Sequence, residues 1–309
     1  MRYFISDLHF FHYNVNEYSN RPFLHTMELN NGQYEVYHDG EVKEIFDNEE
    51  EAIKCKRKLT LSLMHNVFIE NWNNTVSKED DVYYVGDFAF ASYPNIISVL
   101  KKLNGRIHLI KGNHDKGEKL SLEFGFHSYC TEMTLKIKDE EVILNHYPYV
   151  DPRLNKIAEK RPNIVKKYKK SIPDDTEGLR KLVQSAKAKN SFDSALQFLK
   201  SATLKNIHLN DDNKKLYHYI KSTINRYIGT RLINKGKILI HGHTHNEEHI
   251  FANMINVSGE AINYTPVSED EIYERIKDIR EKESDIEYLR KDENLRKYYS
   301  NVYTYNKDI

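Results

Sequence analysis

Short apolar runs recur along this chain, and several of them end in residues that can bind a metal ion or transfer a proton. The runs are rich in Val, Ile and Tyr and only a few residues long, as is typical of buried strands. Five of them end in this way: "YFISDLH", "VYYVGD" (strand 82–85), "RIHLIKGNHD" (strand 106–110), "VILNH" and "KILIHGHTH". Ligand sites of α/β proteins gather at the carboxyl ends of strands. The pattern therefore predicts an α/β fold with one polar site at that edge.

The first run places Asp7 two residues before His9. In an extended chain, residues i and i+2 point to the same side, so both side chains can bind one ion. The alternative is a turn in which Asp7 caps the next helix.

Three glycines precede candidate ligands in the later runs: Gly86, Gly112 and Gly242. Since glycine has no Cβ, we expect each of them to allow the tight turn by which the chain leaves a strand.

The residue types at the strand ends indicate a metal site. Asp, Asn and His without Cys form a donor set that suits Mn²⁺, Fe²⁺ or Zn²⁺. Seven such donors exceed one coordination sphere, whereas two ions about 3.5–4 Å apart would use them all, as in phosphoryl-transfer enzymes. Each run alone is also compatible with a turn, a core histidine or a histidine-rich loop. The five together predict a metal site.

Composition limits the class of protein. The chain has 309 residues, with 46 Lys and Arg against 46 Asp and Glu, and 12% of its residues are aromatic. A chain of this length can bury a sizeable core. Its two cysteines, Cys55 and Cys130, do not suggest a disulfide scaffold. Because the first strand starts near Met1 and no run of about 18 apolar residues occurs, we expect a cytoplasmic protein with no signal peptide and no membrane span.

The balanced total charge hides an asymmetry. Residues 151–235 hold 20 Lys and Arg against 8 Asp and Glu, a net of +12. Apolar residues recur there at spacings of three and four, which predicts a basic helical cap inserted after the "VILNH" run. A basic surface beside the metals would attract a polyanionic substrate, with Lys166 and Lys167 as candidate contacts. The alternative is that these lysines only keep the helices soluble.

The five motifs together resemble those of the calcineurin-like metallophosphoesterase superfamily, whose pattern is D-x-H, G-D, G-N-H-D/E, a lone His and G-H-x-H. "NRPF" and "ENWNN" add a likeness to its small bacterial and phage branch. The resemblance covers residues 1–24, 60–150 and 236–266, and a Gly is frequent where Phe11 stands. It implies a two-sheet α/β sandwich flanked by helices, with catalytic segments 1–150 and 236–266.

The resemblance also implies roles for individual residues. One ion falls to Asp7, His9, Asp87 and His245, and the second to Asp87, Asn113, His146 and His243. Asp87 would bridge the two ions, and a bridging hydroxide would attack the phosphorus. His114 would act as the acid toward the leaving oxygen, held by Asp115. His12 and Arg21 are candidate substrate contacts, with a surface His and a surface Arg as the alternatives.

Two segments lie outside the resemblance. Residues 33–54 alternate like a hairpin that turns at Asp39-Gly40, and a short helix capped by Asp47 or Asn48 is expected to follow. The tail 267–309 is dense in charge and places apolar residues at roughly helical spacing: Ile272, Ile276, Ile279, Ile286 and Leu289. We therefore expect it to pack on the domain as a helix, with dimerisation as the alternative.

The sequence therefore predicts a binuclear phosphoesterase that uses Mn²⁺, with Fe²⁺, Zn²⁺ or Ni²⁺ as alternatives. The favoured substrate is a nucleotide or nucleic-acid phosphodiester. A phosphomonoesterase or protein phosphatase is the second reading. A nucleic-acid-binding scaffold with incidental hydrolysis is the alternative from another class. The sequence does not predict the oligomeric state.

Overall fold

The computed structural model describes residues 1–152, 155 and 231–282. The chain divides into two compact units, one made of Met1–His146 and Ile238–Lys282, the other of Tyr147–Lys237 and Glu283–Ile309. Most of the predicted cap, including Lys166 and Lys167, lies outside the described residues. In the described part, no helix has the length and apolarity that crossing a membrane requires.

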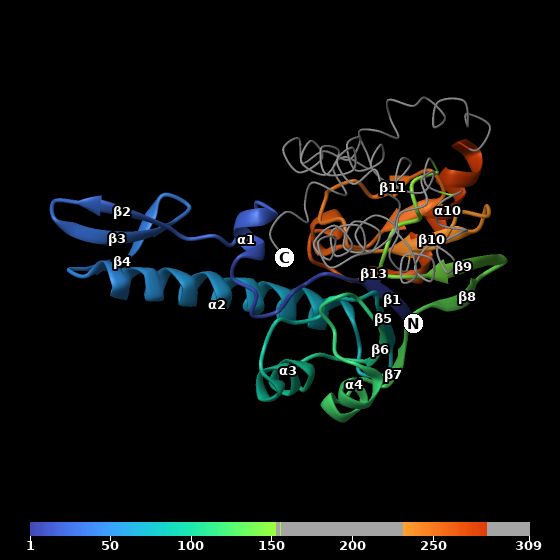
Figure 1. Cartoon of the computed structure of the whole chain (residues 1–309), viewed down its shortest axis with the longest axis horizontal. Coiled ribbons are helices and arrows are strands. Elements are labelled where there is room, and N and C mark those ends of the chain that lie inside the picture. The colour runs from blue at the N-terminus through green and yellow to red at the C-terminus, as the bar shows by residue number, and fades with distance from the viewer. Residues whose placement is uncertain (153–154, 156–230, 283–309) are drawn as a thin grey trace, which may run out of the picture. The chain divides into compact units, whose positions relative to one another are not determined.

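The first five-stranded sheet has the order β13-β1-β5-β6-β7, and only the short β13 runs antiparallel to its neighbour. Helices α3 and α4 connect its parallel strands and lie beside it in Figure 1. Its elements are β1 (Arg2–Ile5), β5 (Asp81–Tyr84), α3 (Tyr93–Leu100), β6 (Arg106–Ile110), α4 (Glu118–Phe124), β7 (Ser128–Cys130) and β13 (Val267–Ser268). The strand predicted at 106–110 has these bounds, and the strand predicted at 82–85 lies one residue earlier.

The second five-stranded sheet has the order β11-β12-β10-β9-β8, with β9, β10 and β12 parallel. The two sheets meet at Ser6, whose backbone N–H donates to Val257 O (2.8 Å) and whose carbonyl accepts from Gly259 N (3.0 Å). Buried residues of both sheets form one hydrophobic cluster. The elements are β8 (Met133–Ile137), β9 (Glu140–Leu144), β10 (Ile238–His241), β11 (Ile250–Phe251), β12 (Met254–Asn256) and the 3₁₀ turn η3 (Gly259–Ile262).

A third, three-stranded sheet packs on the N-terminal part of a long helix (Figure 1). The predicted hairpin turn is confirmed, because Asp39 and Gly40 have φ values of 50° and 77°, as a type I′ turn requires. The expected insertion at 33–54 needs two corrections: a third strand precedes the hairpin, and the helix is not short. The elements are α1 (Val15–Tyr18), β2 (Thr26–Asn30), β3 (Gln33–His38), β4 (Glu41–Phe46) and α2 (Glu49–Thr75).

Helix α2 extends from the small sheet into the hydrophobic core. Asn48 caps it, and its side chain accepts hydrogen bonds from Glu50 N and Glu51 N. The helix continues for 27 residues because one stripe at four-residue spacing is buried: Thr60, Met64, Phe68 and Trp72. Partly buried Leu61, Leu63, Val67 and Ile69 lie between these positions, so the buried stripe is hard to recognise in the sequence.

The first part of the predicted tail belongs to the first unit. Residues 269–282 form α10 (Glu269–Lys282), and Ile272, Ile276 and Ile279 are buried, which confirms the expected packing for this part. Ile286 and Leu289 lie outside the described residues. The protein is thus a mixed α/β protein with several sheets.

Candidate metal centre

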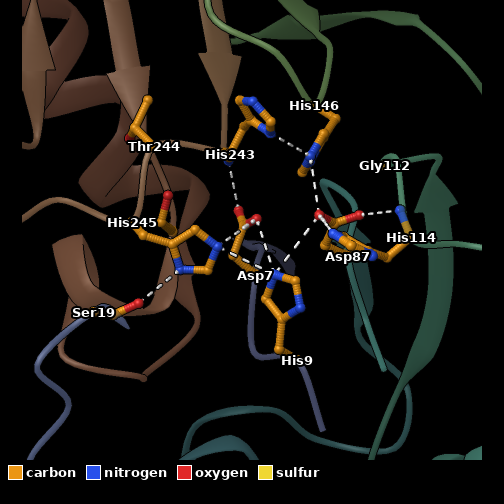
Figure 2. A network of polar contacts seen from close by, with 12 residues as sticks. Asp7, His9, Ser19, Asp87, Gly112, His114, His146, His243, Thr244 and His245 are labelled. Atoms are coloured by element: carbon orange, nitrogen blue, oxygen red, sulfur yellow. Dashed lines mark hydrogen bonds and ion pairs between the residues drawn. The ribbon is translucent and has the colours of Figure 1, made fainter. Parts of the chain in front are cut away.

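The parallel strands of the two large sheets run in the same direction where the sheets meet, at the parallel bridge between Ser6 and Ser258, so their carboxyl ends lie on the same side. The side chains that follow them meet in the network of Figure 2, where aspartates from the first sheet face histidines from the second. The strands that supply them are β1 (Asp7, His9), β5 (Asp87), β6 (Asn113, His114), β9 (His146) and β10 (His243, His245). All seven predicted ligands and the predicted acid therefore lie in one place.

The first cluster consists of Asp7, His9 and His245. The Nε2 atoms of His9 and His245 are 3.1 Å apart, and Asp7 Oδ1 is 3.6 Å from His245 Nε2 and 3.8 Å from His9 Nε2. Ligand atoms about 2.0–2.2 Å from one ion lie about 3–3.5 Å from one another. Asp7 Oδ1 is buried and has no hydrogen-bond partner in the described part of the chain. The three atoms face a common point, as ligands of a divalent ion do.

The second cluster consists of Asp87, His146 and His243. His146 Nε2 is 3.2 Å from His243 Nδ1, 3.4 Å from Asp87 Oδ2 and 3.1 Å from Asn113 Oδ1. His146 Nδ1 donates to Val85 O at 2.9 Å, which directs Nε2 into the cluster. Asn113 thus adds a neutral oxygen donor, and this group also fits a divalent ion.

Asp87 lies between the two clusters. Its Oδ2 is 3.6 Å from His9 Nε2 on one side and 3.4 Å from His146 Nε2 on the other. Its Oδ1 accepts a hydrogen bond from His114 N at 2.8 Å, which fixes the carboxylate in this position. One oxygen atom is therefore within reach of both groups of histidines.

The backbone at the strand ends is not extended, contrary to the expectation for Asp7 and His9. Their φ values are 57° and 51°, and the left-handed conformation also occurs at Asp87 (59°), His243 (72°) and His245 (46°). Non-glycine residues adopt this region rarely, at a cost of about 1–3 kcal/mol each, and such residues cluster at functional sites. The ligands converge through these turns.

All three glycines lie in close approaches, which corrects part of the sequence interpretation: a Cβ on Gly86 would lie 2.4 Å from His146 Nδ1. Gly86 has a positive φ of 91°, as expected for a turn, but Gly112 and Gly242 do not. A Cβ on Gly112 would lie 2.2 Å from Asp87 Oδ1, and one on Gly242 would lie 2.1 Å from Asp7 Oδ2. These two positions are glycine because a ligand carboxylate occupies the space of a side chain.

Asp115 does not hold His114, contrary to the expected role. Its carboxylate accepts hydrogen bonds from the backbone N–H groups of Asp87 and Gly112 (both 2.8 Å) and of Phe88 (3.0 Å). These three backbone hydrogen bonds tie the carboxylate to the loop that carries Asp87 rather than to the ring of His114. Asp115 therefore positions the bridging candidate.

Arg21 is not exposed for substrate contact, so this prediction is wrong. Its side chain is fully buried, and it donates to Glu260 Oε1 (2.8 Å) and to the carbonyl oxygens of Leu8 (2.8 Å) and Asp7 (2.7 Å). A guanidinium that suits a phosphate equally suits carbonyl and carboxylate oxygens. Arg21 supports the loop of the first cluster from behind.

His12 and His114 lie at the border of the clusters. The ring centroid of His12 is 5.4 Å from that of His9 and 6.4 Å from that of His114. Burial lowers the pKa of His12 to about 4. His114 Nε2 has no hydrogen-bond partner in the described part of the chain. Phe11, which directly precedes His12, has a φ of 67°, which accounts for the glycine that the resemblance places there.

Glu260 is a site residue that sequence reasoning missed. This buried carboxylate accepts from His245 Nδ1 at 2.9 Å and from Arg21 Nε at 2.8 Å. Burial acts to raise the pKa of Glu260, but Arg21 and His245 outweigh it and hold the pKa well below its ordinary value. The available signal was the run "MINVSGE", in which an apolar strand, a glycine and a carboxylate follow one another as in the other motifs.

Burial and neighbouring charges shift the pKa values of side chains in both clusters. Burial raises the pKa of Asp7 and lowers that of His9 well below its ordinary value. Burial also acts to lower the pKa of His146, but Asp87 and Asp7 outweigh it and raise this pKa to about 9. Near neutral pH, the His146 ring therefore holds a proton that a metal ion would have to displace.

Mn²⁺ binding is accordingly expected to release a proton and to strengthen as the pH rises toward 9. Below its pKa of about 9, His146 must lose a proton before it can bind a metal. For each released proton, the affinity should rise about tenfold per pH unit. Calorimetric titration at pH 7 in buffers of different ionisation enthalpy measures the released protons. An affinity for Mn²⁺ that stays constant between pH 6 and pH 9 would contradict this assignment.

Comparison with known proteins adds relatives without an assigned activity. No family model matches the chain. The uncharacterized protein MJ1445 of Methanocaldococcus jannaschii is 30% identical over 173 residues, which cover 50% of this chain and 78% of MJ1445. The crystal structure of AQ665, a protein of unknown function from Aquifex aeolicus, is similar at 23% identity and a TM-score of 0.44, covering 89% of this chain and 99% of that one. By its likeness to MJ1445, the chain belongs to the family of that uncharacterized protein.

Proposed function

We propose that this protein is a binuclear metallophosphoesterase. The observation that carries the proposal is the position of Asp87 Oδ2, 3.6 Å from His9 Nε2 and 3.4 Å from His146 Nε2, between two clusters that each fit a divalent ion. The resemblance of the five motifs to the calcineurin-like superfamily supports it. The proposal includes the two-sheet sandwich of that superfamily, since residues of both large sheets share one hydrophobic cluster.

Each residue of the two clusters would have a defined role in metal binding. Asp7, His9 and His245 would hold one ion, and Asn113, His146 and His243 the other, with Asp87 shared; Mn²⁺ is favoured, and Fe²⁺, Zn²⁺ and Ni²⁺ also suit these donors. Two divalent ions supply charge that stabilises the transferring phosphoryl group, and they lower the pKa of bound water.

His114 would give the proton to the leaving oxygen. Its backbone N–H is bonded to Asp87 Oδ1 at 2.8 Å, so its position depends directly on the shared carboxylate. Its Nε2 lies 3.9 Å from Asp87 Oδ2 and has no hydrogen-bond partner in the described part of the chain. An imidazole placed beside the ions with a free nitrogen suits general acid catalysis.

His114→Ala is expected to keep the metal content of the wild type and to lower turnover by about 10²–10⁴-fold on esters with alkoxide leaving groups. The loss should be smaller for nitrophenolate, because a good leaving group needs little protonation. Turnover on paired alkyl and nitrophenyl esters, with metal analysis of the same preparations, measures both effects. Equal losses on the two classes would show that His114 has another role.

The favoured substrate is a nucleotide or nucleic-acid phosphodiester. Its support is the net charge of +12 in residues 151–235, which follow the His146 loop in the sequence. The experiment is a panel with Mn²⁺ that compares bis-nitrophenyl phosphate, nitrophenyl phosphate, cyclic nucleotides and single-stranded DNA or RNA. Preference for nitrophenyl phosphate would favour a phosphomonoesterase or protein phosphatase. Binding of nucleic acid without hydrolysis would favour a scaffold.

A further inference from the structure

A buried ion pair lies directly behind the first cluster. Arg21 Nε donates to Glu260 Oε1 at 2.8 Å, and the two side chains are 0% and 5% exposed. The guanidinium carbon lies 5.8 Å from the ring centre of Phe68 and 5.5 Å from that of Tyr264. Burying two charges is costly unless they are paired and hydrogen-bonded. Such a buried pair is therefore expected to have a structural role, and its two ends contact different parts of the first cluster.

One end of the pair holds the loop of Asp7. Arg21 Nη2 donates to Asp7 O at 2.7 Å, and Nη1 donates to Leu8 O at 2.8 Å. These carbonyls belong to the turn in which Asp7 and His9 both have positive φ. Only the planar fork of an arginine can reach two successive carbonyls and a carboxylate together. Arg21 thus fixes the strained backbone that carries two ligand candidates.

The other end of the pair holds the ring of His245. Glu260 Oε1 lies 2.9 Å from His245 Nδ1, closer than Ser19 Oγ at 3.5 Å, which Figure 2 shows on the same nitrogen. A carboxylate only accepts, so Nδ1 carries the hydrogen and the lone pair of Nε2 faces His9 and Asp7. In metal sites such a partner fixes the tautomer and orientation of a ligating histidine.

We infer that Arg21 and Glu260 are positioning residues that assemble the first cluster as a unit and set its affinity for metal. The oxygen Glu260 Oε1 accepts hydrogen bonds from both His245 and Arg21. Arg21 in turn donates to the carbonyl oxygens of Asp7 and Leu8, so one network connects the ring of His245 to the Asp7 loop. His146 of the second cluster is oriented differently, by Val85 O at 2.9 Å. Disruption of the pair therefore affects one ion and spares the other. This inference rests on the proposed binuclear centre.

The experiment measures the affinity for Mn²⁺ and the metal content of the full-length protein. Glu260→Gln removes the charge at nearly constant volume, and Arg21→Lys keeps the charge but loses the fork. In each variant, one ion should bind about 10–100-fold more weakly than in the wild type, as for other outer partners of metal ligands, while the second ion keeps its affinity. Glu140→Gln is the matched control, because Glu140 pairs with Arg280 at 2.8 Å outside both clusters.

A second measurement needs no variant and holds if both variants fail to fold. In the Zn²⁺-loaded wild type, nitrogen-resolved NMR of the histidine rings should show His245 with a hydrogen on Nδ1. A hydrogen on Nε2 instead, or two ions bound with unchanged affinity in both variants, would overturn the inference. Failure of the wild type to bind any of the metals would overturn the proposed function itself, so the two failures are distinguishable.

Discussion

Asp87→Asn is expected to lose both metal ions and to lower turnover by at least about 10³-fold. The carboxylate faces both clusters with one oxygen, and asparagine would place a neutral amide there. Metal ions supply several kcal/mol of transition-state stabilisation, and about 1.4 kcal/mol corresponds to a factor of ten in rate. Elemental analysis and turnover of the purified variant measure the two losses.

The control for this change is Asp270→Asn. Asp270 pairs with Lys138 on the surface, and its side chain is 67% exposed, so the same chemical change occurs outside both clusters. This variant should retain the metal content and turnover of the wild type. An Asp87→Asn protein that binds two ions per chain and turns over normally would refute the bridging role.

Gly242→Ala is expected to abolish metal binding at the first cluster, although the substitution replaces no ligand residue. The added Cβ would lie 2.1 Å from Asp7 Oδ2 and 2.2 Å from Ser6 Oγ, so Asp7 must move away from His9 and His245. Overpacking of this kind costs about 1–3 kcal/mol of folding stability. The first cluster should therefore lose its metal, and the melting temperature should fall. Metal analysis and thermal unfolding record both effects.

Gly117→Ala is the matched control for this variant. The backbone φ of Gly117 is −69°, which any residue adopts, and nothing lies within 4 Å of an added Cβ. We expect its metal content and melting temperature to match those of the wild type. If Gly242→Ala behaves like Gly117→Ala, Asp7 is not held where the first cluster requires it.

The sequence could predict the position of the site because each motif is local. A short apolar strand followed by ligand residues can be recognised within about ten residues of sequence. Because the strands run parallel, their carboxyl ends then come together in the fold. The type I′ turn at Asp39-Gly40 could be predicted in the same way, since its type depends on two neighbouring residues. These features need no knowledge of distant partners.

The support of the site could not be predicted, because it depends on distant partners. Arg21 and Glu260 are 239 residues apart in the chain. The run "MINVSGE" marks Glu260 as a residue that follows a strand, but it does not indicate that Glu260 pairs with Arg21. The sequence interpretation assigned Arg21 to the substrate because an isolated arginine fits a phosphate as well as it fits a carboxylate. The expectation that Asp115 holds His114 was wrong because the three backbone donors that bind its carboxylate come together only in the folded loop.

The most direct test of the binuclear phosphoesterase is a titration of metal-depleted protein with Mn²⁺, in which bound metal and hydrolysis of bis-nitrophenyl phosphate are recorded together. We predict no hydrolysis without metal, a maximum as the second ion per chain binds, and no rise in the Asp87→Asn variant. Hydrolysis that persists after metal removal, or its absence with two ions bound and with Mn²⁺, Fe²⁺, Zn²⁺ and Ni²⁺ each tried, would contradict the proposal.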